Sequence, residues 1–432
     1  MIDFRILRTK AHLLLPLLLA LFLMPARAAT SQSLPSKGPE TTADSITFSL
    51  ITCGQGDEIY SLFGHTAIRY QRPAQGIDVV FNYGVFDFDT PHFVLRFALG
   101  ETDYLLGVND FRRFCALYTR LERSVSEQVL NLTSEEKLRL LELLEENYRP
   151  ENRTYRYNFF YDNCATRPRN LIEKAIAEGS RLHYAEPMNQ PLDSISFRTL
   201  LRRYSTHALW SRLGMDLCMG SKADRPITRR EMEFVPFCLR DDLRRATIIS
   251  PDGNSRPLVS QELRWNDLPE IHSAEGEMNP TVASGLLLLV VVALTLAGTF
   301  RRRQTLWLLD LLLLASAGIA GCILAFLALF SQHPCVDSNW MLLALHPLHL
   351  LCLPCALRRM RKGLLSRYQM ANLCSLTLFI IVYSLKIQII PLTAVYLALC
   401  LWTRALANLW LSRQGSLKPC PDKQNKTEKS NN

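Results

Sequence analysis

The stretch VASGLLLLVVVALTLAGTFRRR occupies residues 282–303 and divides the chain into two parts of different composition. Its apolar run approaches the roughly 20 residues that an α-helix needs to cross the hydrocarbon core of a bilayer. The chain before this run carries charged residues throughout, whereas the chain after it is mostly apolar. The sequence therefore predicts a globular domain followed by a helical bundle in a membrane.

Four more apolar segments follow, and they cover residues 305–330, 340–357, 371–385 and 391–411. Basic residues cluster after the first, third and fifth segments. These clusters are Arg301–Arg303, Arg358–Arg367 and the tail 412–432. Because cytoplasmic loops are enriched in Lys and Arg, these ends are predicted to be cytoplasmic. A bundle of about five helices over 282–411 then places the globular domain on the outer face of the cytoplasmic (inner) membrane.

The basic loops account for much of the formal net charge of +9, so this charge does not indicate nucleic-acid binding. Two ionisable residues, Asp310 and Arg404, lie inside predicted spans, where charges are costly and usually have a partner. They form either a mutual pair or separate groups at the level of the membrane surface.

The N-terminus has the features of a signal peptide over residues 1–28. Arg5–Lys10 is basic, Leu13–Met24 is apolar, and Ala26–Ala28 has the small residues of a cleavage site. An uncleaved N-terminal anchor is the alternative, and under either interpretation the globular domain is exported. Residues 29–45 are rich in Ser, Pro, Gly and Thr and are predicted to be a linker.

The exported domain is predicted to cover residues 46–250, with a polar juxtamembrane linker over 251–281. Residues 46–52, 65–71 and 79–86 have the alternation or composition of β-strands. Residues 133–148 are the clearest helix, because Thr133 and Glu136 match a capping box before an apolar stripe. Residues 170–177 form a second predicted helix, and the fold class is therefore α+β.

Five of the twelve cysteines lie in this domain: Cys53, Cys115, Cys164, Cys218 and Cys238. An odd number in an oxidising compartment leaves at least one thiol unpaired within the chain. Disulfides Cys218–Cys238 and Cys53–Cys115 are expectations that leave Cys164 free, although the sequence does not determine the connectivity.

Cys164 is the candidate nucleophile. A reactive thiol needs a group that favours thiolate and a donor for the oxyanion, and a helix N-terminus offers unpaired N–H groups for both. Pro168 places the start of the helix near Thr166, so Cys164 lies in the turn that leads into it. His65 is the candidate base, and Gly64 beside it permits a close approach by backbone or substrate.

Three segments together resemble the signature of the Lnb-type lipoprotein N-acyltransferase family. They are GHTAIR at 64–69, NYG at 82–84, and YN at 157–158 with DNCAT at 162–166. The order of His before an Asn-Cys pair is also similar to circularly permuted NlpC/papain-like enzymes. The resemblance covers about residues 45–173 and implies a permuted papain/NlpC-like fold.

The resemblance further implies a thiol-dependent acyl transfer. His65 would deprotonate Cys164, which would take an acyl chain from the diacylglyceryl group of a bacterial lipoprotein as a thioester. The amine of the lipoprotein's N-terminal cysteine would then receive the chain. The implied partners are diacylated lipoproteins and membrane lipid.

Other residues of these segments have candidate supporting roles. Asn163, or a backbone N–H beside the nucleophile, would stabilise an oxyanion. Asp162, Asn82 or Tyr83 would orient the histidine, as the third member of a triad does. Arg69 would bind a lipid phosphate or a carboxylate, or form a structural salt bridge.

Each of two segments is predicted either to contact lipid or to have a purely structural role. The loop 333–340 would present lipid or dock the domain, or would be a simple interface loop. An aromatic cluster would form a wall for acyl chains or part of the core. Its members are Tyr155, Tyr157, Phe159, Phe160 and Tyr161.

Two other functions fit the same residues. A cysteine peptidase or amidase that acts on cell-wall peptide would use the same thiol and imidazole. A non-enzymatic membrane module would keep Cys164 as a structural residue. The His and Cys spacings match no usual metal-ligand pattern, and no Gly-rich phosphate loop or cofactor motif is present.

Overall fold

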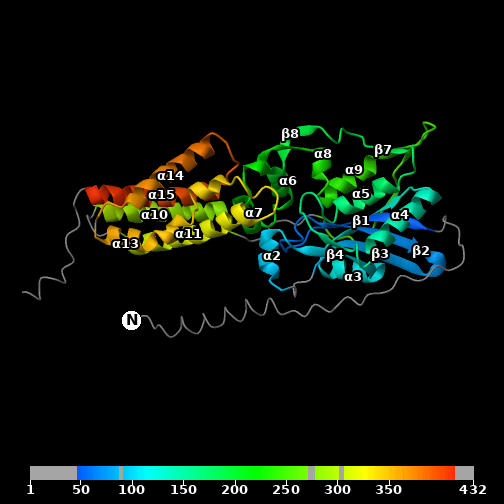
Figure 1. Ribbon diagram of the computed structural model, residues 1–432, viewed down its shortest axis with the longest axis horizontal. Coiled ribbons are helices and arrows are strands. Elements are labelled where there is room, and N and C mark those ends of the chain that lie inside the picture. The colour runs from blue at the N-terminus through cyan, green and yellow to red at the C-terminus, as the bar shows by residue number, and fades with distance from the viewer. Residues whose placement is uncertain (1–45, 87–90, 271–277, 301–305, 363, 414–432) are drawn as a thin grey trace, which may run out of the picture.

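The computed structural model describes residues 46–86, 91–270, 278–300, 306–362 and 364–413. It consists of a mixed α+β domain and a bundle of apolar helices (Figure 1). The domain and the bundle follow one another along the long axis of the molecule. The predicted fold class is therefore confirmed. The predicted signal peptide (1–28) and linker (29–45), and residues 414–432 of the tail, lie outside the described residues.

A seven-stranded antiparallel sheet forms the centre of the domain, in the order β12-β5-β1-β2-β3-β4-β6. Its strands are β1 (Thr47–Cys53), β2 (His65–Arg72), β3 (Ile77–Val85), β4 (Asp103–Asp110), β5 (Val125–Leu130), β6 (Thr154–Arg156) and β12 (Val259–Arg264). The first three strands match the predicted ones to within about two residues. Their β-branched and aromatic residues are buried on both faces, because helices cover both sides of the sheet.

Helices cover the two faces of the sheet unequally (Figure 1). On one face lie α4 (Ser134–Tyr148), α5 (Thr166–Ala175) and α9 (Pro236–Arg245), which share a core with β1, β2 and β3. On the other lies α3 (Phe111–Arg120). The predicted capping box of α4 is present, since the Thr133 and Glu136 side chains bond each other's backbone N–H.

A helical layer between the sheet and the bundle was missed by the sequence analysis, together with two small sheets. The layer contains α6 (Phe197–Tyr204), α7 (Leu209–Cys218) and α8 (Arg229–Met232). One small sheet has three strands, β7 (Arg181–His183), β10 (Thr247–Ile249) and β11 (Ser255–Pro257). The other has two strands, β8 (Pro191–Ser196) and β9 (Pro226–Thr228). The predicted linker 251–281 is also corrected. Residues 255–257 and 259–264 form β11 and β12, and β12 completes the edge of the main sheet.

The predicted disulfides are wrong. All eleven cysteines in the described part of the chain are free, including the expected pairs Cys218–Cys238 and Cys53–Cys115. Cys218 packs towards the bundle, whereas the Cys238 thiol lies 3.6 Å from the Tyr204 hydroxyl in the helical layer. Cys53 is buried on β1 and is also free, so the odd number of cysteines in the domain did not indicate which of them pair.

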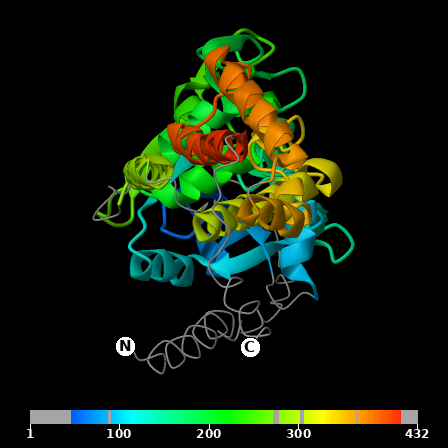
Figure 2. The ribbon, with the colours of Figure 1, turned by 90° about the vertical axis from the view of Figure 1, so that its left-hand side faces the viewer.

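The bundle contains α10 (Pro280–Phe300), α11 (Trp307–Phe330), α12 (Leu348–Leu351), α13 (Leu353–Arg361), α14 (Arg367–Ser384) and α15 (Leu392–Arg413). Viewed nearly end-on, α15 lies between α10 and α14 (Figure 2). In the described chain α10, α11 and α15 are long and apolar enough to cross a membrane. The predicted third span is broken, because its two halves, 340–351 and 353–361, meet at 77°. The predicted fourth span is α14, which is shorter than α10, α11 and α15 and is not among the helices that are apolar enough to cross.

Two loops of the bundle hold the domain through hydrogen bonds. In the loop after α11, the Cys335 carbonyl accepts a hydrogen bond from the Gly220 N–H (2.7 Å), and the Ser338 carbonyl accepts one from the Ser221 N–H (3.2 Å). The loop before α15 donates from Gln388 to the Met219 carbonyl (3.1 Å). The loop 333–340 therefore joins the domain to the bundle, whereas its predicted roles at the membrane remain predictions.

The two charges inside the spans form a mutual pair. Arg404 contacts Asp310 through two hydrogen bonds of 2.7 and 2.9 Å, and both side chains are buried. Thr295 accepts a further bond from Arg404 at 3.1 Å, and Asn408 donates to Asp310 at 3.1 Å. This network joins α10, α11 and α15.

We predict that Asp310→Ala destabilises the bundle, because it leaves the Arg404 guanidinium buried without a counter-charge. Breaking such a pair costs roughly 3–5 kcal/mol. The midpoint of thermal unfolding in detergent should fall, and the double variant Asp310→Leu/Arg404→Leu should recover most of it. Equal midpoints for wild type and Asp310→Ala would contradict a structural role of the pair.

Candidate active site

The sheet opens between β2 and β3 at the ends nearest the helical layer. Backbone pairing of these strands begins at Ile68 and Phe81, and residues 65–67 have no partner on β3 among the described residues. Extending the register would place His65 opposite Gly84. On its other side β2 stays paired with β1 up to His65 and Cys53. The opening therefore exposes backbone N–H groups of β2 towards β3.

His65 and Asn82 bridge this opening. The distance between His65 Nε2 and Asn82 Oδ1 is 2.5 Å. The imidazole also lies parallel to the Tyr118 ring of α3, with 6.3 Å between centroids. Of the three residues predicted to orient the histidine, Asn82 is the one in contact with it. Nδ1 has no hydrogen-bond partner in the described part of the chain.

Cys164 enters the opening from the turn before α5. The helix begins at Thr166, as predicted from Pro168. The Cys164 sulfur accepts a hydrogen bond from the Thr66 N–H, the residue after His65. A methyl group placed on Gly84 would lie 3.7 Å from the Cys164 Cβ. Nucleophile and base candidates, 99 positions apart by number, thus lie at one opening of the sheet.

Asn163 builds the turn that holds the thiol. Its side-chain oxygen accepts from the Ala165 and Thr166 N–H groups, both at 2.9 Å. Its amide nitrogen donates to the Phe159 carbonyl at 2.9 Å and to the Phe234 carbonyl at 2.8 Å. Both amide hydrogens are therefore used. Of the two predicted oxyanion donors, the backbone N–H groups fit this geometry better than the Asn163 side chain.

Burial raises the pKa of the Cys164 thiol to about 11, although several groups act in the opposite direction. The Thr66 N–H and the Cys164 N–H donate to the sulfur, Arg123 contributes positive charge, and the Tyr157 hydroxyl donates as well. At neutral pH the resting thiol is thus protonated. A base is needed at the moment of attack.

Burial also lowers the pKa of His65 to about 4, and the nearby Arg123 lowers it further, while the bond to Asn82 opposes this. The imidazole is therefore neutral at every pH well above 4 and can accept a proton. The resting pair is therefore a neutral thiol and a neutral imidazole.

The other predicted site residues have structural contacts. Asp162 forms a two-pronged ion pair with Arg167 at 2.6 and 2.8 Å, and does not contact His65. Tyr83 is fully buried, and its hydroxyl has no hydrogen-bond partner among the described residues. Gly64 has a φ of +84°, and a Cβ there would lie 2.7 Å from the Cys53 carbonyl oxygen, so only glycine fits.

Arg69 forms the salt bridge that was one of its two predicted roles. Its guanidinium pairs with Asp78 at 2.7 Å and with Glu127 at 2.8 Å, and lies 3.5 Å from the centroid of the Phe111 ring. All three contacts are on the α3 face of the sheet, away from the thiol. Arg69 thus holds the sheet to α3.

Two residues near the thiol were missed as functional candidates. Tyr157 appeared only as part of a motif and an aromatic cluster, yet its hydroxyl bonds the thiol. Arg123 precedes β5 and gives no local signal. It is 7% exposed, its Nε donates to the Gly54 carbonyl at 2.8 Å, and its Nη2 has no partner in the described structure. Only the fold brings this buried cation near the thiol.

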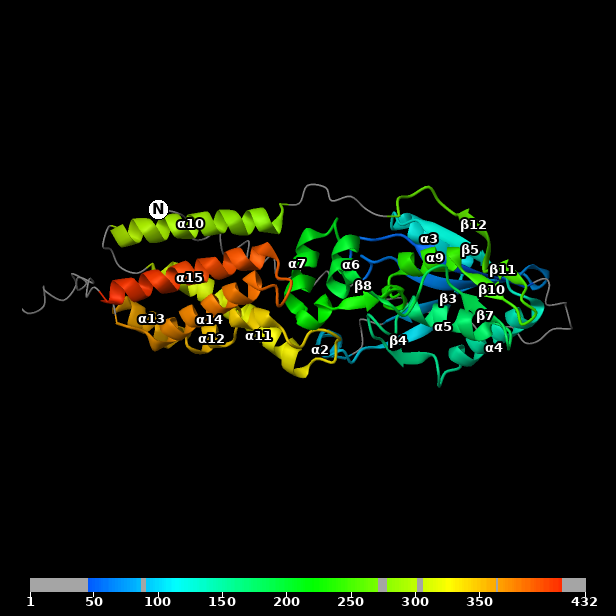
Figure 3. The same cartoon turned by 90° about the horizontal axis from the view of Figure 1, so that it is seen from above.

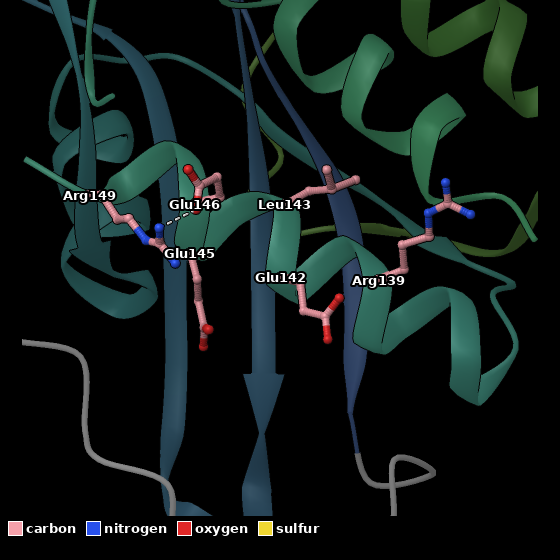
Figure 4. A pocket seen from close by; sticks show the side chains of 6 residues that line it. All are labelled: Arg139, Glu142, Leu143, Glu145, Glu146 and Arg149. Carbon is pink, nitrogen blue, oxygen red and sulfur yellow. Dashed lines mark ion pairs between the residues drawn. The ribbon is translucent and has the colours of Figure 1, made fainter. Parts of the chain in front are cut away.

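The outer surface of α4 carries a shallow depression of about 460 Å³ (Figure 4). Its lining residues are Arg139, Glu142, Leu143, Glu145, Glu146 and Arg149. Figure 4 shows these mostly charged side chains along one side of a single helix, with Arg149 paired to Glu146. Neither the thiol nor the imidazole lines it, and it has the character of a solvated helix face.

The fold and the site define a membrane protein with an extracytoplasmic α+β domain, in which a thiol and an imidazole lie at the same opening between two strands. A family model of the Lnb N-terminal periplasmic domain matches residues 39–203, and a model of the Lnb transmembrane domain matches residues 272–415. The chain belongs to the Lnb family of lipoprotein-processing membrane proteins. Neither the curated proteins nor the solved structures gave a match.

We predict that alkylation of Cys164 by iodoacetamide, followed by peptide mass spectrometry, accelerates as the pH rises towards about 11. Tyr157→Phe and Arg123→Met each remove a group that lowers the thiol pKa. Each should therefore slow alkylation at pH 8, by about twofold to tenfold, since one pKa unit is a tenfold change in thiolate. Tyr161→Phe, at an exposed ring in the same segment, is the matched control. Wild-type rates in both site variants would contradict the assigned contacts.

Proposed function

We propose that this protein is a lipoprotein N-acyltransferase that uses Cys164 as nucleophile and His65 as general base. One observation carries the proposal: the thiol is hydrogen-bonded to the Thr66 N–H in the gap that His65 and Asn82 bridge. A cysteine, a histidine and an asparagine that orients the histidine form the set found in papain-like enzymes. The lipoprotein substrate is proposed from the family to which both domains belong.

The first half-reaction moves an acyl chain from an ester to the thiol. His65 takes the Cys164 proton at its unpaired Nδ1, and the sulfur attacks an ester carbonyl of the diacylglyceryl group. When the tetrahedral intermediate collapses, the C–O bond breaks and the proton passes from His65 to the glycerol oxygen. The products are an acyl-thioester at Cys164 and a lipoprotein with one free glycerol hydroxyl.

The second half-reaction moves the chain to nitrogen. The α-amine of the lipoprotein's N-terminal cysteine attacks the thioester carbonyl, while His65 accepts a proton from that amine. The C–S bond then breaks, the proton returns to the sulfur, and an amide is formed. The sum of both steps exchanges an ester for an amide, and it requires neither an oxidant nor a reductant.

Backbone donors at the thiol fit the negative charge that develops in both steps. The N–H groups of Thr66 and Cys164 already bond the sulfur. An oxyanion forms two bonds away from this sulfur, on the carbon that the sulfur attacks, so the same groups are within reach of it after a small shift. The Tyr157 hydroxyl is a third candidate, and Arg123 adds positive charge without a carboxylate partner within 4 Å among the described residues.

A membrane-embedded ester suits the architecture better than a soluble peptide. The domain is held to the bundle by backbone hydrogen bonds rather than by a free tether, which keeps the site near the outer leaflet of the cytoplasmic membrane. The thiol is also surrounded by rings of Tyr104, Tyr155 and Tyr157. A thioester in such surroundings is protected from water while it waits for an amine.

We predict that purified protein in detergent or nanodiscs transfers an acyl group to the N-terminal amine of a diacylated lipoprotein, as seen by mass spectrometry of its N-terminal peptide. Cys164→Ala and His65→Ala should each abolish transfer. Cys115→Ala, at a half-buried thiol of α3 that packs on the α3 face of the sheet, is the control and should retain it. Transfer that persists in both site variants would refute the dyad.

Asn82→Ala tests the orienting contact separately. Without the bond at 2.5 Å, the imidazole loses the partner that holds it at the gap. We expect kcat to fall by about tenfold to a thousandfold, with a much smaller change in KM, because a general base contributes about 10²–10⁴-fold. Asn82→Asp should recover part of the rate, since a carboxylate oxygen can accept the same hydrogen bond. Unchanged kcat in Asn82→Ala would assign the orienting role elsewhere.

The same assay separates the alternatives. Cleavage of cell-wall fragments by the wild type, without acyl transfer, would favour a cysteine peptidase or amidase. Absence of both activities, together with wild-type folding of Cys164→Ala, would favour a membrane module without catalysis.

A further inference from the structure

A short apolar helix, α2 (Phe93–Leu99), projects from the domain and exposes its hydrophobic side chains. Val94 is 66% exposed, Leu95 51% and Phe97 48%. No residue of this helix is buried, so it contributes little to the core of the domain. Such a cluster on a soluble surface is unfavourable and commonly marks a site of interaction with a membrane or another protein.

The position of α2 beside the bundle favours a membrane over another protein as the surface that it contacts. The helix lies against the end of α11 that faces the domain (Figure 3). Gln332 donates its N–H to the Leu99 carbonyl at 2.8 Å, and His333 Nε2 lies 2.6 Å from the Phe97 carbonyl oxygen. A Cβ at Gly100 would lie 3.0 Å from the His333 nitrogen, so the two segments are in close contact.

This contact places α2 at the depth where α11 leaves the membrane. Leu329 and Phe330 end α11 with 75% and 63% of their surface exposed, as expected of side chains that face lipid. The Phe97 ring of α2 packs on the His333 ring just beyond this end of α11, with 5.5 Å between centroids. Trp210 of α7, 50% exposed, lies on the same side of the domain and donates to the Met278 carbonyl just before α10. Aromatic residues at this level are typical of a membrane interface.

A row of aromatic rings connects α2 with the thiol. Phe97 packs on Phe93 (6.3 Å between centroids), Phe93 on Phe86 (5.8 Å), and Phe86 on Tyr104 (5.2 Å). Tyr104 in turn stacks on Tyr157 at 4.2 Å. The Tyr157 hydroxyl donates to the Cys164 sulfur. The row is therefore continuous from the bundle to the nucleophile, and Tyr60, 59% exposed, adds a ring at 5.6 Å from Phe86.

We propose that the exposed face of α2 inserts into the outer leaflet of the membrane, and that the aromatic row leads an acyl chain from that leaflet to Cys164. This inference rests on the proposed acyl transfer for its second half, whereas the insertion of α2 stands on the geometry alone. An acyl chain that leaves the bilayer through water exposes each methylene, so a continuous apolar wall lowers the barrier to reaching the thiol. Residues of α2 are therefore specificity determinants for the lipid part of the substrate.

Photocrosslinking tests the insertion independently of activity. A benzoylphenylalanine at position 95 of the full chain, in nanodiscs of phosphatidylglycerol and phosphatidylethanolamine, should form adducts with lipid acyl chains that mass spectrometry detects. The matched control is position 138, because Leu138 is exposed to a similar extent (47%) on α4, at the end of the domain away from the bundle (Figure 1). Equal lipid labelling at positions 95 and 138 would overturn the proposal. So would adducts of position 95 with a second protein chain in place of lipid.

The activity of matched glutamate variants tests the acyl route. For each variant, transfer from a diacylated lipoprotein in nanodiscs is divided by the rate at which a soluble acetyl thioester acylates Cys164. We expect this ratio to fall at least tenfold in Leu95→Glu relative to Leu138→Glu, and to fall more for long acyl chains than for short ones. Equal ratios in the two variants would overturn the route. Absence of any transfer by the wild type would instead overturn the proposed function, and the crosslinking result would still decide the insertion.

Discussion

The parting of β2 from β3 beyond Ile68 and Phe81 is the constraint on which the site depends. A sheet that stayed paired to its end would use the Thr66 N–H in the ladder and leave no room for the turn before α5. Opening the sheet would expose unsatisfied backbone groups, which is unfavourable in a protein interior. In this protein the Cys164 sulfur accepts a hydrogen bond from the exposed Thr66 N–H. The hydrogen bond between His65 and Asn82 connects β2 and β3 across the same gap.

The electrostatics of the opening favour a neutral resting state. Burial penalises both thiolate and imidazolium, so the pKa of the thiol is raised and that of the imidazole is lowered. Hydrogen-bond donors at the sulfur and the Arg123 cation act against this penalty for the thiolate. The Cys164 thiol is therefore protonated at rest, and groups that would stabilise its charged form are already in place, as in the preorganised sites that lower a reaction barrier.

Local sequence patterns predicted the parts of the fold that depend on local chemistry. The alternation of β1 and β2, the capping box at Thr133 and the long apolar runs of α10, α11 and α15 are patterns of neighbouring residues, and each was found. The helical layer of α6, α7 and α8 was missed because its helices are short and lack a long apolar period. At the site, Cys164 and His65 were recognisable by type, whereas the choice of Asn82 over Asp162 required the register of β3. Arg123 was invisible for the same reason, since its neighbours come from other strands and loops.

The hydrogen bonds that Gly220 and Ser221 of the domain donate to the loop after α11 fix the domain to the bundle as a cap. A fixed cap cannot search the space above the bilayer for its substrate. In the proposed acyl transfer, encounters with a lipoprotein would then come from lateral diffusion of two proteins within one membrane. The reaction rate would be governed by how many lipoproteins occupy each unit of membrane area, so expanding the membrane with inert lipid would slow the reaction even at constant bulk concentration.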